Sequence, residues 1–159
     1  MNSVPILPTR LDWPSAIGNF LLNFGPLEYL VFVFLKDHLQ PEEFDRVKEY
    51  HLKDRLNRIE QQLKQEGYPM DERGAFAALA EAIGPIRDLR NRLAHGHLYS
   101  RYDVETKKWS VTVFQAKDAD TGFLPTSRHV EFDDLLTALE RLTELIEELQ
   151  RFVGFKPET

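Results

Sequence analysis

Apolar residues recur every three or four positions over four long stretches of the sequence, and this spacing constrains the fold more than any other feature. Such a period places the apolar side chains on one face of a helix. We therefore expect four long helices, over about residues 15–38, 41–67, 71–96 and 133–153. Within the first of them, residues 30–35 are apolar on every side, which indicates burial on every side and contact with another subunit.

Between the third and fourth helices the period changes from about 3.6 residues to two. LYSRYD and KWSVTVFQ alternate around VETK, which is typical of a β-hairpin, and SRHVEF suggests a further short strand. We expect an all-α dominated protein: an up-and-down four-helix bundle with a small β-hairpin insertion at about 98–131. The length suits a single domain over 1–159, with 154–159 as a tail.

Composition limits the classes of chemistry and the compartment. The chain has no cysteine, which excludes disulfides, a thiol nucleophile and thiolate metal sites. The N-terminus lacks the pattern of a secretory signal, and the apolar run LEYLVFVFL is too short to span a bilayer. A cytoplasmic protein without a membrane partner is therefore expected. The net charge of -6 argues against a general nucleic-acid coat protein.

The charge is nevertheless uneven along the chain. Residues 87–101 hold four arginines against one aspartate, a net +3, whereas residues 131–148 hold seven acids against one arginine. The basic stretch begins RDLRNRLAHGHLY, and on a helix Arg87, Asn91 and His95 form a column beside the apolar face. Arg90 lies at the edge of that face. A local anion site is therefore compatible with the overall negative charge.

A guanidinium beside a core needs an anion. Glu28, on the apolar face of the first helix, is an internal candidate for Arg90, and a bound phosphate is an external one. His95 falls in the last turn, where the helix dipole favours a charged imidazole, and it can serve as acid or base. The alternative is purely structural: Arg90 pairs with Glu28, Asn91 is solvated and His95 ends the helix.

The segment RNRLAHG, residues 90–96, resembles the signature of HEPN domains (higher eukaryote and prokaryote nucleotide-binding). That signature is an arginine, a polar residue and a histidine four to six residues further on, matched here by Arg90, Asn91 and His95. The segment FGPLEYLVFVFL also resembles the first helix of many HEPN domains. The resemblance implies a HEPN-like helical bundle over most of the helical chain, without the β insertion.

The resemblance further implies a metal-independent endoribonuclease that acts as a homodimer in a toxin–antitoxin or defence setting. Arg90 would hold the scissile phosphate, Asn91 would orient it, and His95 would transfer protons, leaving a 2′,3′-cyclic phosphate. No metal and no cofactor are expected. The substrate-binding residues would be drawn from the neighbouring basic and aromatic side chains: Arg87, Arg92, His97, Tyr99 and Arg101.

Two alternatives stay open at this point. In toxins of this family that are modified by a partner, a tyrosine lies two residues after the histidine. Here His97 occupies that place, and the longer register from Arg90 to His97 would restore it as Tyr99. We prefer His95 because it shares the column of Asn91. The second alternative is an inactive HEPN-like module that binds nucleotide, RNA or a partner protein such as a cognate antitoxin.

Overall fold

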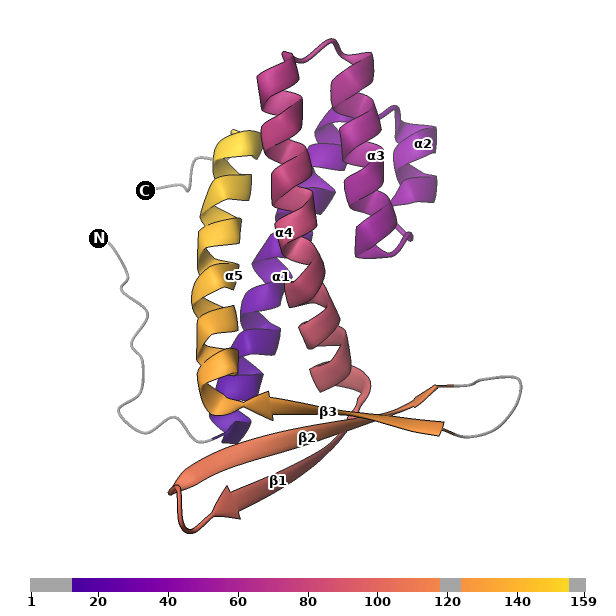
Figure 1. The fold of residues 1–159 in the computed structure, drawn as a ribbon. Coiled ribbons are helices and arrows are strands. Elements are labelled where there is room, and N and C mark those ends of the chain that lie inside the picture. The colour runs from indigo at the N-terminus through magenta and orange to yellow at the C-terminus, as the bar shows by residue number, and fades with distance from the viewer. Residues whose placement is uncertain (1–12, 118–123, 155–159) are drawn as a thin grey trace. The chain divides into compact units, whose positions relative to one another are not determined.

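The computed structural model describes residues 13–117 and 124–154, and among these it contains five helices and three strands (Figure 1). In chain order they are α1 (Trp13–His38), α2 (Pro41–Val47), α3 (Leu52–Gln65), α4 (Met70–His95), β1 (His97–Asp103), β2 (Lys108–Lys117), β3 (Leu124–Glu131) and α5 (Phe132–Val153). The fold class expected from the sequence is confirmed: helices dominate, and a small antiparallel sheet is inserted between α4 and α5.

The chain forms two compact units. Of the described residues, the first unit, called the sheet unit here, comprises 13–22, 90–117 and 124–139, and the second, called the helical unit, comprises 23–89 and 140–154. Each of the long helices α1, α4 and α5 therefore contributes one part to each unit. The single domain over 1–159 stays a prediction.

The sheet unit is built on three antiparallel strands in the order β1-β2-β3. Residues 104–107 form the turn between β1 and β2, where the Asp103 carboxylate accepts hydrogen bonds from the backbone N–H groups of Glu105 and Thr106 at 2.9 and 3.0 Å. Lys107 takes a positive φ of 55°, which closes the turn. The hairpin and the third strand are both as the alternating pattern predicts.

The described buried apolar side chains of the sheet unit come from α1, α4, β2, β3 and α5. They are Trp13, Ala16, Phe20, Leu93, Val111, Val113, Val130, Leu135 and Ala138. Trp13 in the first turn of α1 contacts Phe132 in the first turn of α5, with ring centroids 5.1 Å apart and planes at 73°. Edge-to-face contact is a favourable aromatic arrangement. It joins the start of α1 to the residue that follows β3.

The helical unit departs from the sequence prediction at 41–67, where one helix was expected. The chain forms two helices instead, because α2 ends at Val47 and His51 takes an extended backbone, with φ of -60° and ψ of 151°, before α3 begins. The turn brings α2 back beside α3 (Figure 1), and Phe44 of α2 reaches Phe32 of α1 at 5.0 Å between ring centroids. His51 itself is exposed, although the helical period of 41–67 would place it on the apolar face.

This turn also explains the apolar stretch at 30–35. Leu30, Val31, Phe34 and Leu35 are buried, and α2 covers Phe32 within the same unit. A second subunit is therefore not required to cover this part of α1. The expectation that this stretch meets another subunit stays a prediction.

Helix ends are displaced by one or two residues from the sequence prediction. α4 begins at Met70 instead of 71, which places Asp71 in its first turn, and the Arg73 N–H bonds to the Pro69 carbonyl at 3.0 Å. α5 ends at Val153, followed by Gly154 with a φ of 67°. The rest of the expected tail, 155–159, lies outside the described residues.

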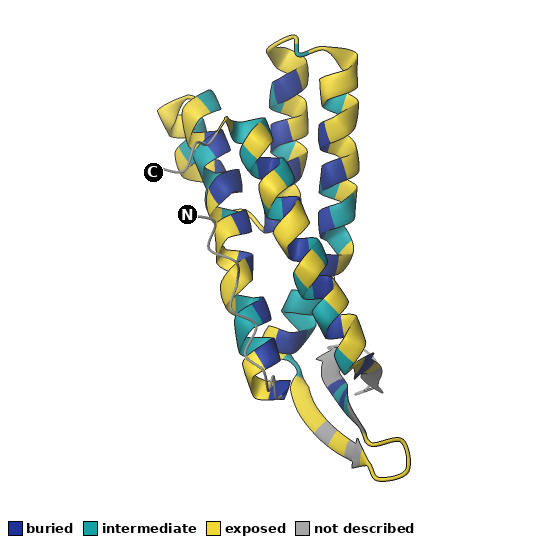
Figure 2. Ribbon diagram, turned by 90° about the vertical axis from the view of Figure 1, so that its left-hand side faces the viewer, coloured by how far each residue is buried: buried dark blue, intermediate teal, exposed yellow. Residues whose placement is uncertain are grey.

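Helix α1 is the one candidate membrane span among the described residues, by its length of 26 residues and its composition alone. Core helices of soluble proteins and signal sequences pass the same test. Buried residues follow one side of each long helix and exposed residues the other (Figure 2). That pattern is typical of helices packed in a water-soluble fold, and α1 does not establish a membrane protein.

Ile59 provides a test of the helical core. Its side chain is fully buried in α3, so truncation to alanine leaves a cavity as well as removing apolar contacts. We expect Ile59→Ala to lower the free energy of unfolding by about 2–5 kcal/mol, measured by urea denaturation. Asn57→Ala, at an exposed position of the same helix, is the matched control. A loss below about 1 kcal/mol for Ile59→Ala would contradict this packing.

Candidate functional site

The motif residues lie in the last turns of α4, which belong to the sheet unit. Arg90 and Asn91 are half-buried, and the Arg90 guanidinium donates a hydrogen bond from Nη1 to Asn91 Oδ1 at 3.1 Å. Adjacent residues on a helix point about 100° apart, so this bond requires the two side chains to bend toward each other. The structure therefore brings together the guanidinium and the amide that the sequence singled out.

His95 is the last residue of α4 and is exposed. Asn91 and His95 are four residues apart on the same helix, which places them on one face. Among the side chains that the structure describes, none forms a hydrogen bond or ion pair with the His95 imidazole. The imidazole is thus accessible to a ligand, and the described part of this chain does not fix its orientation.

A single residue separates strand β1 from the end of α4, and β1 carries three of the predicted substrate-binding residues. His97, Tyr99 and Arg101 alternate along β1, share one face of the strand and are all exposed. Arg92 is half-buried in the last turn of α4, in the same unit. The sheet unit therefore places the motif and these four residues on directly connected segments.

Two predicted residues belong to the helical unit instead. The Arg87 guanidinium bonds to the carboxylate of Asp88, at 2.8 Å from Nη2 and 3.1 Å from Nε. The Glu28 carboxylate lies 3.8 Å from Nη2 of Arg55 in α3. Arg55 is thus a partner of Glu28 that the sequence did not suggest, and the pairing of Glu28 with Arg90 stays a prediction.

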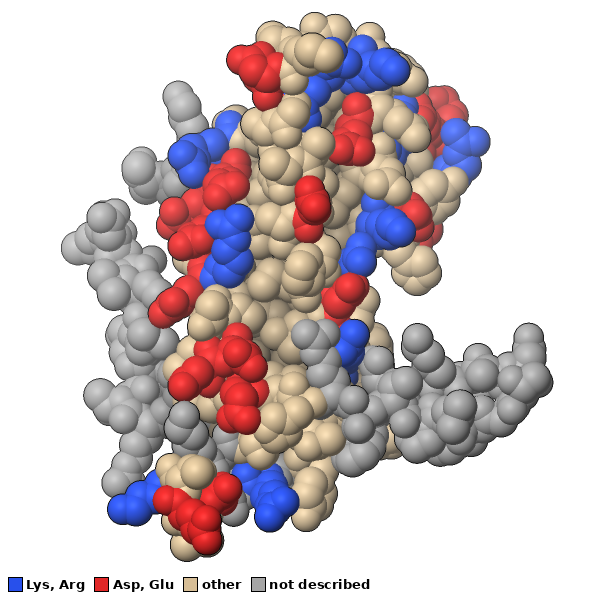
Figure 3. Space-filling model, in the orientation of Figure 1, with Lys and Arg blue, Asp and Glu red and all other residues tan. Residues whose placement is uncertain are grey.

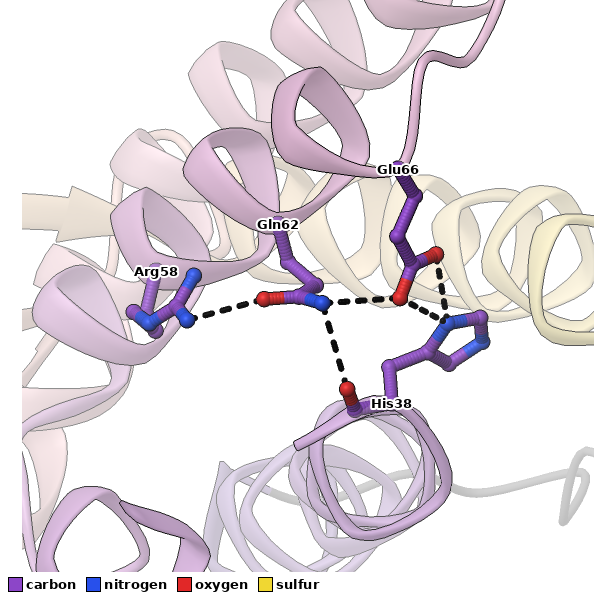
Figure 4. A network of polar contacts seen from close by, with 4 residues as sticks. All are labelled: His38, Arg58, Gln62 and Glu66. Carbon is purple, nitrogen blue, oxygen red and sulfur yellow. Dashed lines mark hydrogen bonds and ion pairs between the residues drawn. The ribbon is translucent and has the colours of Figure 1, made fainter. Parts of the chain in front are cut away.

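A polar network in the helical unit was not predicted from the sequence (Figure 4). The His38 Nδ1 atom lies 2.9 Å from the Glu66 carboxylate, and the Gln62 amide donates to Glu66 at 2.8 Å and to the His38 carbonyl at 3.2 Å. Arg58 donates to Gln62 at 2.8 Å and to Glu43 of α2 at 2.6 Å. The network ties the end of α1 and α2 to one side of α3.

The network favours the ionised form of its two carboxylates, Glu66 and Glu43. Partial burial pushes the pKa of Glu66 up, but the hydrogen bonds from Gln62 and His38 outweigh it and lower that pKa. The hydrogen bond from Arg58 lowers the pKa of Glu43. The only sequence signal for the network was the four-residue spacing of Arg58, Gln62 and Glu66 on α3. Its described side chains bond to one another and join three helices, so we interpret the network as structural.

Other features of the helical unit hold none of the predicted site residues. An open pocket lies at the start of α4 and the end of α5. It is lined by Tyr68, Glu72, Ala75, Leu79, Glu148, Arg151 and Phe152. Acidic side chains gather along α5, on the left in Figure 3. Among the described residues no group of three or more histidines and carboxylates has the arrangement of a metal site.

No family model matches the chain, and the comparisons with curated proteins and with solved structures give no match either. The resemblance of residues 90–96 to HEPN domains therefore stays a prediction from the sequence. What the site can do has to be argued from its own residues.

The polar network gives a pH-dependent prediction. A carboxyl group whose pKa is lowered by folding stabilises the fold above its ordinary value of 4.5, and this contribution is lost as pH falls through the lowered pKa. At pH 7 we expect Glu66→Gln to melt about 1–3 °C below the parent chain, as partly exposed pairs are weak. The difference should shrink steadily below pH 4.5 in a series of thermal melts.

The control for this series is Glu60→Gln, at an exposed position of α3. It removes the same charge from the same helix outside the network, so its melting temperature should follow the parent chain at every pH. A deficit of Glu66→Gln that stays constant between pH 7 and pH 3 would show that the lost charge is not the cause.

Proposed function

We propose that the chain is a metal-independent endoribonuclease of the HEPN type that acts as a dimer. The observation that supports this most is the arrangement at the end of α4. Arg90 is hydrogen-bonded to Asn91, and His95, on the same helix face as Asn91, is exposed at the terminus. A guanidinium, an amide and an accessible imidazole are the groups needed to hold a phosphodiester and to move protons at it.

In the proposed reaction, Arg90 binds a non-bridging oxygen of the scissile phosphate and stabilises the charge that develops on it. The ribose 2′-oxygen attacks phosphorus and loses its proton, while the 5′-oxygen of the next nucleotide leaves and gains one. The products are a 2′,3′-cyclic phosphate and a 5′-hydroxyl. Two proton transfers are needed, and a dimer that faces its two motifs together supplies two imidazoles for them.

The second candidate function is an inactive module that binds nucleotide, RNA or a partner protein. It is favoured by the His95 imidazole, which no described residue of this chain orients. A catalytic base is ordinarily held by a third group. The net charge of -6 also weakens binding of a long polyanion. In this second function Arg90 and Asn91 still bind a phosphate or a carboxylate, but no bond is broken.

Incubation with mixed-sequence RNA in EDTA separates the two functions. We expect cleavage that leaves 2′,3′-cyclic phosphate ends, and we expect Arg90→Ala and His95→Ala each to lower its rate by about a hundredfold or more. His97→Ala should leave most of the chemical step intact, because His97 lies on β1 and not on the helix face of Asn91. The cyclic ends are identified by their resistance to phosphatase until acid opens the ring, whereas a 3′-monophosphate is removed directly.

Thermal melts and sedimentation accompany the assay. His95 is exposed, so His95→Ala should keep the melting temperature and the oligomeric state of the parent chain. A parent chain that binds RNA but leaves it intact would favour the binding module. Sedimentation of a monomer under the conditions in which RNA is cleaved would exclude a cleft built from two copies.

A further inference from the structure

Side chains from all three strands line up across the outward face of the sheet. In the antiparallel register Tyr99 of β1 lies opposite Thr112 of β2, which lies opposite His129 of β3. Side chains alternate between the two faces of a sheet. Val111, Val113 and Val130 are buried at the intervening positions, so they occupy the other face. The row Tyr99–Thr112–His129 therefore crosses the solvent-facing side of all three strands.

Both rings of this row are exposed. Tyr99 is 63% exposed and the His129 side chain 53%. The His129 ring also has a partner at each nitrogen: Thr112 Oγ1 at 3.5 Å from Nδ1, and Glu131 Oε1 at 2.7 Å from Nε2. An exposed ring held at its edges keeps its place on the sheet, and such a ring loses little conformational freedom when a flat ligand stacks on it.

Charges of both signs surround the row. Arg101 and His97 are exposed on the same face of β1 as Tyr99. Two carboxylates lie near them: Glu131 bonds to His129, and Asp103 accepts hydrogen bonds from two backbone N–H groups, which lower its pKa and keep it ionised. A face with exposed rings and mixed charge favours an occupant that is held by stacking and makes few phosphate contacts, and a short segment of unpaired RNA fits this description.

We propose that this sheet face binds unpaired nucleotides of the RNA beside the cleavage site, with one base stacked on Tyr99 and another on His129. The inference rests on the function proposed for His95. Tyr99 stands two strand residues from His97, about 7 Å along β1, and Tyr99 and His129 are two strand spacings or about 10 Å apart. Bases of a duplex are stacked on one another and cannot use these rings, so the substrate is single-stranded at this position.

Binding is measured on the full-length His95→Ala chain, which keeps the RNA intact, by fluorescence anisotropy of a labelled 12-nucleotide RNA in EDTA. The same RNA annealed to its complement is the duplex probe. We expect the single strand to bind more tightly than the duplex. In this background Tyr99→Ala should weaken binding of the single strand about tenfold, as loss of one stacked base would, and His129→Ala should weaken it to a similar extent.

Matched variants separate stacking from other effects. Tyr99→Phe keeps the ring and should bind as the parent does, whereas Tyr99→Leu keeps apolar bulk without a ring and should bind as Tyr99→Ala does. Tyr29→Ala removes an exposed tyrosine of α1 outside this face and should have no effect. Equal affinity for duplex and single strand, or unchanged binding by Tyr99→Ala and His129→Ala, would overturn the inference.

The outcome for the sheet face is distinguishable from that for the ribonuclease. Stacking by Tyr99 with no cleavage by the parent chain supports the sheet face and rejects the nuclease. Cleavage that Tyr99→Ala leaves unchanged in both rate and affinity rejects the sheet face and keeps the nuclease. If RNA does not bind at micromolar concentration and Tyr99→Ala alters sedimentation of the chain, the face is a protein interface and the inference is wrong.

Discussion

A single residue, Gly96, separates the end of α4 at His95 from the start of β1 at His97. This short junction is the constraint on which the candidate site depends. It leaves no linker that would let the helix-borne groups and the strand-borne groups move apart. The Gly96 N–H bonds to the Arg92 carbonyl at 2.8 Å, so the last turn of α4 is completed before the strand begins. The motif and the sheet therefore act as one piece of structure.

The other end of the sheet is held in a similar way. β3 ends at Glu131 and α5 begins at Phe132, and the Glu131 N–H bonds to the Asp134 carboxylate at 3.3 Å. Phe132 then contacts Trp13. The start of β1 and the end of β3 are thus each joined to a helix with at most one residue between them. The strands that carry Tyr99, Thr112 and His129 are therefore held in place. Preorganised groups of this kind bind a flexible ligand at a lower entropic cost than groups on a free loop.

Sequence periodicity predicted most of the fold, since helices and strands are encoded by local spacing. It failed at 48–51, because KEYH contains neither glycine nor proline and the turn is fixed by distant contacts such as Phe44 with Phe32. The His38–Glu66 pair was missed for the same reason, as its members are 28 positions apart in the sequence. Arg90, Asn91 and His95 could be selected because they are close in sequence. His129 could not, since its place beside Tyr99 depends on the register of three strands.

Charge segregation along the chain has a consequence for any RNA that binds. Much of the -6 of the whole chain lies on α5, whereas the candidate site lies in a stretch with a net +3. A bound RNA can therefore place only a few of its phosphates against basic side chains before it meets acidic, repulsive surface. Affinity for RNA then cannot come mainly from counterion release, which grows with the number of phosphates neutralised. Base stacking does not depend on charge, and on a chain of this sign it is the interaction best able to hold an unpaired strand against Arg90 and His95.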